Sequence, residues 1–302
     1  MNQQFLTELK AVTAENRIFT DEPMKKHTTF RVGGPADILV QPKGTELAAV
    51  IRLCRKYDVP YQVIGNGSNL LVGDRGIRGL VIEMLSKEDE ICVEDDCITV
   101  GAGMLLSKTA NRAAEHGLTG MEFAAGIPGS IGGAVVMNAG AYGGEMKDIL
   151  TAVTVLDQEE NEKILSAEEL ELGYRTSCIL KKGYIVTGAK IKLKHGEETA
   201  IRARMEELKK QRVEKQPLEY PSAGSTFKRP EGYFAGKLIM DAGLRGYLVG
   251  EAQVSEKHCG FVINRGNATA ADVRTLMQNV ADIVEEKFGV RLEPEVKMIG
   301  EF

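Results

Sequence analysis

Ser225 is the residue whose neighbours most clearly suggest a chemical role. It lies in "AGSTFKRP" (223–230), where a glycine lets the backbone bend and where Lys228 and Arg229 follow closely. A serine hydroxyl both donates and accepts, so Ser225 could be a nucleophile, a phosphate ligand, a plain turn residue or something rarer. No GxSxG surrounds it and no histidine lies near it in the sequence, which disfavours a hydrolase nucleophile. The other three roles stay open on this segment alone.

A first glycine-rich stretch, "GNGSNLLV" (65–72), directly follows a predicted strand. It begins like the dinucleotide fingerprint GxGxxG, but Leu70 stands where the third glycine should be, and no helical pattern follows. A Rossmann-type site is therefore disfavoured. The loop still offers successive backbone N–H groups that can hold a phosphate, and the alternative is a plain hairpin turn.

A second stretch, "GIPGSIGGAVVMNAGAYGG" (126–144), contains seven glycines in nineteen residues. Its other residues are mostly apolar, unlike those of a flexible linker. Glycine among apolar residues indicates that another backbone or a ligand must come close. Two such loops suit a large ligand with a pyrophosphate, and flavin adenine dinucleotide (FAD) has that shape. There is no GxxxxGK[ST], so a nucleoside-triphosphate P-loop is disfavoured.

Composition limits the classes of partner and compartment. The chain has 302 residues, 43% of them hydrophobic and 27% charged, as in an ordinary globular protein. Its net charge of −5 gives no general attraction to nucleic acid or to an anionic membrane. There is no apolar run of about 18 residues, and the start of the chain is polar. Five cysteines without a CxxC predict a reducing, cytoplasmic setting with no metal site and no disulfide.

Hydrophobic periodicity predicts a mixed α/β chain. Thr45 is expected to cap a helix whose buried face carries Leu47, Val50, Ile51 and Cys54. The predicted strands and hairpins are 36–42, 61–65, 79–84, 91–103, 151–166, 183–196, 260–264 and 291–300, and the further helices are 104–116, 197–217, 233–243 and 269–289. The highly charged helix 197–217 is expected to be solvated rather than to bind a ligand, and the change in composition there predicts a domain boundary.

Six motifs, taken in order, resemble a known family. They are "HTTFRVGGPA" (27–36), "GNGSNLLV", "GIPGSIGGAVVMNAGAYGGE", "GYRTS" (173–177), "AGSTFKRP" and "LEPEVKMIG" (292–300). Each is weak alone, but the ordered set resembles the UDP-N-acetylenolpyruvoylglucosamine reductases, also called UDP-N-acetylmuramate dehydrogenases. The resemblance covers nearly the whole chain.

The resemblance implies an α+β fold class. Residues 1–200 would form an FAD-binding domain of the vanillyl-alcohol-oxidase-like (PCMH) type, in two α/β lobes that divide near residue 84. Residues 201–302 would form a smaller α/β substrate-binding domain. The implied reaction uses non-covalent FAD with NADPH as co-substrate to reduce the enolpyruvyl double bond of UDP-N-acetylglucosamine enolpyruvate. The product, UDP-N-acetylmuramate, is a cytosolic peptidoglycan precursor.

Three catalytic residues follow from the family motifs. Ser225 would give a proton to the enolate carbon that forms when hydride reaches the vinyl group. Arg175, in "GYRTS", would stabilise the enolate, because a guanidinium stays charged and presents a planar set of donors. Glu295, in "LEPEV", would help to polarise the substrate carboxylate. From spacing alone, a surface ion pair for Arg175 and an exposed strand position for Glu295 are the simpler interpretations.

The resemblance also implies binding residues. Expected cofactor-binding residues lie in the two glycine-rich stretches: Gly65, Asn66, Gly67, Ser68, Asn69, Leu70, Gly126, Ile127, Pro128, Gly129, Ser130, Gly133, Asn138, Ala139 and Gly140. Expected substrate-binding residues are Tyr174, Lys228, Arg229 and His258. A solvated basic turn is the alternative for Lys228 and Arg229, and a structural histidine is the alternative for His258.

One departure and two rival functions remain. Only "TSCILKKG" separates Arg175 from the next predicted strand, which resembles the shorter subtype without a substrate-closing tyrosine loop. A flavin oxidase of the same fold often carries its flavin on His or Cys. His27 lies near the first motif, but neither glycine loop contains His or Cys. The second rival is a non-catalytic flavin or UDP-sugar binder, which the joint presence of Ser225, Arg175 and Glu295 disfavours. A monomer is expected.

Overall fold

The computed structural model describes residues 3–84 and 91–302, and its chain divides into two compact units. The first unit consists of Met1–Phe19, Leu39–Asn66 and Leu80–Arg212, and the second of Thr20–Ile38, Gly67–Gly79 and Val213–Phe302. Both units are therefore assembled from separate stretches of chain, whereas the expected boundary at residue 200 is linear. That boundary concerns functional domains and stays a prediction.

A four-stranded sheet with the order β1-β2-β5-β3 is formed by strands within residues 18–83. Its strands are β1 (Ile18–Pro23), β2 (Pro35–Val40), β5 (Ile77–Glu83) and β3 (Tyr61–Ile64), and its helices are α1 (Gln3–Val12) and α2 (Leu47–Lys56). The strands β3 and β5 run parallel, and α1 packs against α2. The predicted face of α2 is buried, but Thr45 does not cap the helix. Instead a 3-10 turn precedes it, closed by the Glu46 carboxylate, which accepts from the Lys43 N–H at 2.9 Å.

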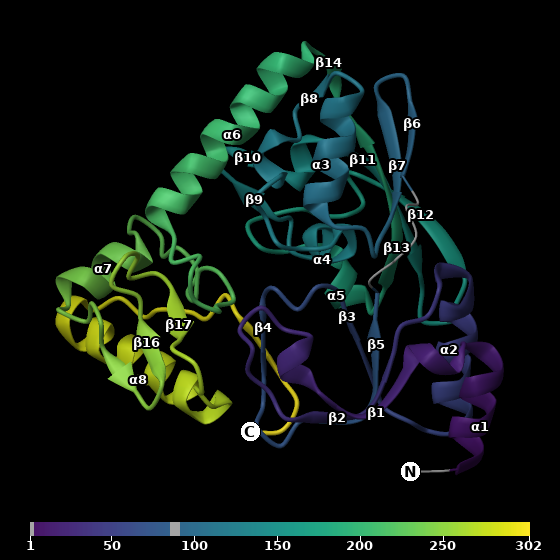
Figure 1. The fold of residues 1–302 in the computed structure, drawn as a ribbon, viewed down its shortest axis with the longest axis horizontal. Coiled ribbons are helices and arrows are strands. Elements are labelled where there is room, and N and C mark those ends of the chain that lie inside the picture. The colour runs from purple at the N-terminus through teal and green to yellow at the C-terminus, as the bar shows by residue number, and fades with distance from the viewer. Residues whose placement is uncertain (1–2, 85–90) are drawn as a thin grey trace. The chain divides into compact units, whose positions relative to one another are not determined.

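A five-stranded antiparallel sheet forms the centre of the first unit, in the order β12-β11-β13-β7-β6 (Figure 1). Its strands are β6 (Ile91–Glu94), β7 (Cys97–Gly101), β11 (Leu150–Leu156), β12 (Glu162–Ser166) and β13 (Ile185–Lys192). Both hairpins expected from the sequence are present, because β6 pairs with β7 and β11 pairs with β12. The helices α3 (Leu106–Glu115), α4 (Ile131–Val136), α5 (Cys178–Lys182) and α6 (Glu198–Lys215) complete this part, with the short strands β8 (Leu118–Thr119), β9 (Gly140–Ala141), β10 (Gly144–Glu145) and β14 (Lys194–His195).

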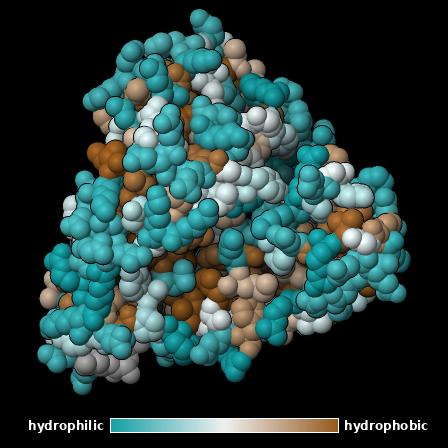
Figure 2. All heavy atoms as spheres, turned by 180° about the vertical axis from the view of Figure 1, so that it is seen from behind, coloured by the Kyte–Doolittle hydropathy of each residue, from teal (hydrophilic) through white to brown (hydrophobic). Residues whose placement is uncertain are grey.

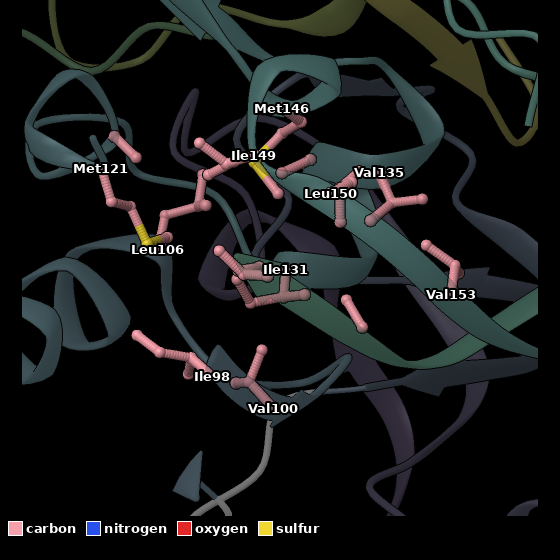
Figure 3. Close-up of a cluster of buried hydrophobic side chains, with 14 of the residues drawn as sticks. Ile98, Val100, Leu106, Met121, Ile131, Val135, Met146, Ile149, Leu150 and Val153 are labelled. Atoms are coloured by element: carbon pink, nitrogen blue, oxygen red, sulfur yellow. The ribbon is translucent and has the colours of Figure 1, made fainter. Parts of the chain in front are cut away.

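The core of this unit lies between the large sheet and α3 and α4. Figure 3 shows Ile131 and Val135 of α4 among Ile98 and Val100 of β7 and Val153 of β11, all buried. This packing matters for function because it makes α4, which follows the second glycine-rich loop, a rigid support. Each fully buried aliphatic side chain of this kind contributes about 1.5–3 kcal/mol to folding.

The second unit joins a three-stranded sheet, β15-β16-β17, to two helices. The elements are β15 (Leu248–Val249), β16 (Ala252–Val254), β17 (Val262–Asn264), α7 (Ala235–Asp241) and α8 (Ala270–Phe288). Figure 1 shows α8 running along β16, against which it packs. Thr269 and Asp272 form a capping box at the start of α8, and Gly289 ends it with a φ of +69°.

The predicted strand 291–300 is shorter than expected. Only β18 (Lys297–Ile299) is a strand, and it pairs in parallel with β4 (Leu70–Val72).

On the face that Figure 2 shows, hydrophilic residues predominate and apolar residues gather in a few patches. No helix among residues 3–84 and 91–302 is long and apolar enough to cross a membrane.

Candidate active site

The first unit brings the two glycine-rich stretches together. Gly65 follows β3, and a Cβ placed on it would lie 2.2 Å from the Ser130 Oγ. The Asn66 Nδ2 donates a hydrogen bond to the Pro128 carbonyl. Only glycine allows this close approach at position 65, as the sequence pattern suggested for these loops in general.

The second loop is fixed where it enters α4. Ser130 is 2% exposed and caps α4, with its Oγ accepting from the Gly133 N–H at 3.4 Å. The residues on either side of Ser130 bond to the segment before α3. The Leu106 N–H donates to the Gly129 carbonyl at 3.0 Å, and the Ile131 N–H donates to the Met104 carbonyl at 2.8 Å. The loop is thus held to the start of α3 as well as to α4.

These neighbouring loops leave backbone donors available. Within the described residues, the N–H groups of Asn66, Gly129 and Ser130 donate to no protein acceptor. Uncharged backbone N–H groups without a protein acceptor can hold an anionic phosphate without a lysine or arginine. The absence of a side chain at Gly65 lets Ser130 of the second loop approach the first loop closely. The local geometry therefore fits the pyrophosphate of FAD.

The rest of the first glycine stretch belongs to the second unit. Gly67 has a φ of +59°, and a Cβ there would lie 1.9 Å from the His27 carbonyl oxygen, so this position also requires glycine. Ser68 follows with a partly exposed side chain. The Asn69 Nδ2 donates to the Glu295 carbonyl at 3.1 Å, and Leu70 begins β4. This half of the stretch thus supports the segment that carries Glu295.

Asn138, expected to bind the cofactor, lies fully inside the protein with 0% exposure. Its Nδ2 donates to the Glu145 Oε2 at 2.6 Å and to the Gly173 carbonyl at 3.1 Å, while its Oδ1 accepts from the Lys147 N–H at 2.9 Å. Its φ of +41° is a conformation that asparagine tolerates better than most residues. The side chain therefore connects three segments of the first unit, and a role in binding FAD stays a prediction.

Arg175 lies at the tip of a tight turn in the same unit. Gly173 and Thr176 exchange backbone hydrogen bonds of 3.1 and 3.3 Å, which leaves Tyr174 and Arg175 as the two central residues. Arg175 has a φ of +54°, and its guanidinium carbon lies 5.3 Å from the centroid of the Tyr174 ring. Tyr174 is 55% exposed. The turn therefore presents a cation and an aromatic ring together.

Ser225 lies in the second unit on a backbone held from both sides. Its segment pairs with Phe261 on one edge and, through Phe227, with Pro294 on the other. Gly224, with a φ of +76°, turns the chain immediately before it. The side chain of Ser225 is exposed, so its hydroxyl is presented on a rigid support.

Thr226 is the residue that fixes Ser225, and sequence reasoning missed it. It is 1% exposed, its N–H donates to the Gly260 carbonyl at 2.9 Å, and its Oγ1 accepts from the Val262 N–H at 2.9 Å. Its carbonyl accepts from the Glu295 N–H at 2.8 Å. Thr226 thereby places Ser225 and Glu295 on adjacent extended segments. No periodicity or motif in "AGST" distinguishes this buried threonine from an ordinary turn residue.

Glu295 is the most enclosed of the three expected catalytic residues, with 9% exposure. Its neighbour two residues earlier, Glu293, is exposed and forms an ion pair with the Lys228 Nζ at 2.9 Å. The two glutamates therefore have different environments, although their spacing suggested one shared strand face. The alternative interpretation from spacing alone, an exposed strand position for Glu295, is therefore wrong, and its catalytic role stays a prediction.

The expected substrate residues of the second unit differ in exposure. Lys228 is half-buried, whereas Arg229 is exposed. The guanidinium carbon of Arg229 lies 4.0 Å from the centroid of the Phe234 ring. The His258 Nδ1 accepts from the Gly260 N–H at 3.1 Å, and its ring meets Phe261 edge-on at 5.0 Å. Burial lowers the pKa of His258, so its imidazole is neutral at pH 7. These contacts favour the structural alternative for His258.

Two further observations limit the chemistry. In the part of the chain that the structure describes, no group of three or more His, Cys, Asp or Glu side chains could hold a metal ion.

The charged helix α6 was expected to be solvated, yet it buries Ile201 and Leu208, and Arg212 continues their spacing. The spacing of Arg212 from Ile201 and Leu208 could have predicted its place on the buried face of the helix, but we expected the whole helix to be solvated.

Comparisons with known proteins match two stretches of the chain. Residues 36–166 match the model of an FAD binding domain. Residues 216–299 match the model of the C-terminal domain of UDP-N-acetylenolpyruvoylglucosamine reductase. The first match contains both glycine-rich stretches, and the second contains Ser225 and Glu295.

Relatives and a solved structure agree along the full length. The chain is 57% identical to the UDP-N-acetylenolpyruvoylglucosamine reductase of Agathobacter rectalis, with all of both chains covered. It is 52% identical to that of Caldanaerobacter subterraneus, again over all of both chains. A crystal structure of the enzyme from Thermus caldophilus superimposes with a TM-score of 0.78 at 40% identity, over 91% of this chain and 97% of that one. The chain therefore belongs to the UDP-N-acetylenolpyruvoylglucosamine reductase family, and it is an FAD-dependent oxidoreductase of peptidoglycan precursor synthesis.

Proposed function

We propose that Ser225, Arg175 and Glu295 carry out the NADPH-dependent reduction of UDP-N-acetylglucosamine enolpyruvate to UDP-N-acetylmuramate. Family membership supports the overall reaction. The observation that carries the assignment of residues is the exposed Ser225 hydroxyl on a backbone fixed by the buried Thr226. A proton donor needs such a fixed position, because its transfer is efficient only from hydrogen-bonding distance.

FAD fits the paired glycine loops of the first unit. The backbone N–H groups of Asn66, Gly129 and Ser130 would hold its pyrophosphate, and Gly65 lets the two loops come close enough to do so together. When bound, FAD would supply the hydride needed to reduce the vinyl group of the substrate. The protein residues then have to stabilise the resulting negative charge and deliver a proton.

Ser225 gives its hydroxyl proton to the carbon next to the substrate carboxylate. The electron pair of the enolate forms the new C–H bond, and the serine oxygen recovers a proton from solvent. A neutral hydroxyl is a weak acid towards most groups, but an enolate carbon is basic enough to accept its proton. Exposure of Ser225 allows the return of the proton from water.

Arg175 and Glu295 act on the charge of the substrate. The guanidinium of Arg175 stabilises the enolate oxygens by charge and by its planar donors, and its place in a turn of two hydrogen bonds limits its motion. The enclosed carboxyl group of Glu295 polarises the substrate carboxylate. Tyr174 would contact the sugar or diphosphate, and its exposure and its place beside Arg175 support that role.

Compartment and assembly are part of the proposal. The enzyme would act in the cytoplasm, where UDP-linked peptidoglycan precursors are made, and the five free cysteines agree with a reducing compartment. It would act as a monomer, without nucleic acid or membrane. Light scattering of the purified enzyme across concentrations tests the monomer, and a concentration-dependent mass contradicts it.

The test follows the two half-reactions separately. The flavin-loaded enzyme is reduced anaerobically with NADPH, and UDP-N-acetylglucosamine enolpyruvate is then added while flavin absorbance is recorded. Wild-type absorbance should recover with substrate, and the recovery in Ser225→Ala should be at least about 100-fold slower, the usual contribution of a proton donor. Ser222→Ala, in the same segment, is the matched control. Equal recovery in Ser225→Ala and wild type would exclude Ser225 as the donor.

A further inference from the structure

A tight turn at residues 28–31 contacts the segment that carries Ser225. The Arg31 N–H donates to the Thr28 carbonyl at 3.1 Å, which leaves Thr29 and Phe30 as the two central residues of the turn. The turn lies within "HTTFRVGGPA" (27–36), none of whose residues acts in the proposed mechanism. The turn and Ser225 both belong to the second unit, so their contact lies within one compact body.

The turn is a fixed support because its second central residue is buried. Phe30 is 0% exposed and packs in the core of the second unit. Its carbonyl accepts from the Asn264 Nδ2 at 3.2 Å, and Asn264 is itself 1% exposed. The Asn264 N–H donates to the Pro221 carbonyl at 2.9 Å, so one residue holds both the turn and the chain that leads to Ser225. Packing and hydrogen bonds together therefore set the position of Thr29.

From this position the side chain of Thr29 holds the chain in front of Ser225. The Thr29 Oγ1 donates to the Ser222 carbonyl at 2.7 Å, across 193 residues of sequence. Only two residues separate Ser222 from Ser225, and one of them is Gly224. Gly224 has a φ of +76° and no Cβ, so it restricts the backbone less than any other residue would. Thr226 fixes the chain after Ser225, and the hydrogen bond from Thr29 fixes the chain before it.

The backbone of the same threonine meets the first glycine-rich stretch. The Thr29 N–H donates to the Gly67 carbonyl at 3.3 Å. Gly67 approaches the turn so closely that a Cβ on it would lie 1.9 Å from the His27 carbonyl oxygen and 2.9 Å from the Thr28 Cα. Thr29 therefore contacts a residue expected to bind the cofactor through its N–H, and the segment of the proposed proton donor through its hydroxyl.

We propose that Thr29 is a positioning residue for the proton transfer, because its hydroxyl holds the Ser225 segment in a fixed place beside the first glycine-rich stretch. The inference rests on the proposed function, since it takes Ser225 as the donor. The O–H bond of Ser225 breaks, the electron pair of the enolate forms the C–H bond, and Thr29 itself exchanges no proton. Proton transfer requires hydrogen-bonding distance, and a misplacement of about 1 Å can slow a reaction about 100-fold.

The test separates the Thr29 hydroxyl from the rest of its side chain. Thr29→Ala deletes the hydroxyl and the methyl group, whereas Thr29→Ser deletes the methyl group alone. In the anaerobic assay, NADPH should reduce the flavin of Thr29→Ala at the wild-type rate, but recovery with UDP-N-acetylglucosamine enolpyruvate should be about tenfold or more slower. Thr29→Ser should recover like wild type. Both variants keep the backbone N–H, so their flavin content should be unchanged.

Thr28→Ala is the matched control. The buried Thr28 hydroxyl donates to the Val32 carbonyl at 3.1 Å, so its removal deletes a similar hydrogen bond nearby without touching the Ser225 segment. This control should lower the melting temperature and leave the rate of recovery close to that of wild type. A solvent isotope effect adds a readout that destabilisation alone would not move. Recovery in D₂O should be slowed more in Thr29→Ala than in wild type, because proton transfer then limits the rate more strongly.

A double variant shows whether Thr29 acts through Ser225. With the donor already missing, Thr29→Ala combined with Ser225→Ala should recover no more slowly than Ser225→Ala alone. The proposal is overturned if Ser225→Ala is slow while Thr29→Ala recovers like Thr28→Ala, or if the two losses multiply in the double variant. A Ser225→Ala enzyme that recovers like wild type contradicts the proposed function, and the inference with it, so the two failures are told apart. Thr29→Val, which has bulk but no hydroxyl, takes the place of Thr29→Ala if that variant does not fold.

Discussion

Replacing Asn138 should lower the stability of the first unit and loosen the turn that carries Arg175. Asn138→Ala removes two hydrogen bonds donated by Nδ2 and one accepted by Oδ1, all from a side chain with 0% exposure. It leaves the Gly173 carbonyl, the Lys147 N–H and the Glu145 carboxylate short of a partner. Water can reach part of these groups, so each lost hydrogen bond should lower the free energy of unfolding by about 1 kcal/mol, the lower end of the usual range.

The backbone adds a separate cost. Alanine at a φ of +41° is less favourable than asparagine, by about 1 kcal/mol. The free energy of unfolding should therefore fall by about 4 kcal/mol in Asn138→Ala and by about 3 kcal/mol in Asn138→Gly, which tolerates this φ. Urea denaturation of both variants measures the two values, and their difference isolates the backbone contribution.

The catalytic consequence follows from the hydrogen bond to Gly173. This residue begins the turn that carries Arg175, so loss of the Asn138 contact should allow the guanidinium to move. We expect kcat to fall about tenfold or more, with smaller effects on KM and on flavin content. Asn138 would then be a positioning residue.

Ser177→Ala is the matched control for Asn138. The Ser177 hydroxyl donates to the Val136 carbonyl at 2.8 Å, so its removal deletes one neutral hydrogen bond between the same two regions. A loss of about 1 kcal/mol is expected, with kcat nearly unchanged. The reasoning is refuted if Asn138→Ala unfolds within about 1 kcal/mol of wild type, or if its kcat matches that of Ser177→Ala.

Three further predictions concern other parts of the chain. Gly65→Ala should lower the ratio of flavin to protein, since its Cβ would lie 2.2 Å from the oxygen of a buried serine in the facing loop; an unchanged ratio contradicts this. The Lys163 ammonium holds the pKa of Asp157 at about 2, below its ordinary value of 3.8, so the stabilisation is present above pH 4 and is lost as the pH falls towards 2. Asp157→Asn should therefore melt below wild type at pH 7, with a gap that narrows from pH 5 to pH 3, whereas a gap independent of pH would exclude the linkage. Burial raises the pKa of Cys54 to about 12, so iodoacetamide should modify the exposed Cys92 in the native enzyme and reach Cys54 only after unfolding, as peptide mass spectrometry can show.

Elements with a local pattern could be predicted from the sequence. The helix 269–289 shows its apolar spacing over five turns, and the structure confirms it as α8. Both hairpins of the large sheet have polar turn residues between alternating strands, and both are confirmed. The short strand β18 could not be bounded in this way, because Pro294 and its neighbours pair with the Ser225 segment, which is distant in sequence.

The site shows the same limit. The two glycine-rich loops could be predicted from their composition, and the structure brings Gly65 and Ser130 together. Thr226 gave no such signal, because its importance lies in what it contacts and not in what surrounds it in the chain. The role of a buried polar residue of this kind follows from its hydrogen-bond partners, which are distant in the sequence and become known only from the structure.

The parallel pairing of β18 with β4 has a consequence for synthesis on the ribosome. The Arg75 guanidinium donates to the Phe302 carbonyl across 227 residues of sequence, and β4 finds its partner strand in the same distant segment. At translation rates of about 5–20 residues per second, β4 waits on the order of 10–45 seconds for that partner. During this interval its backbone groups are an unpaired strand edge, which is prone to pair with other chains. The nascent enzyme therefore has a defined period in which a chaperone that covers residues 67–79 would raise the yield of folded protein.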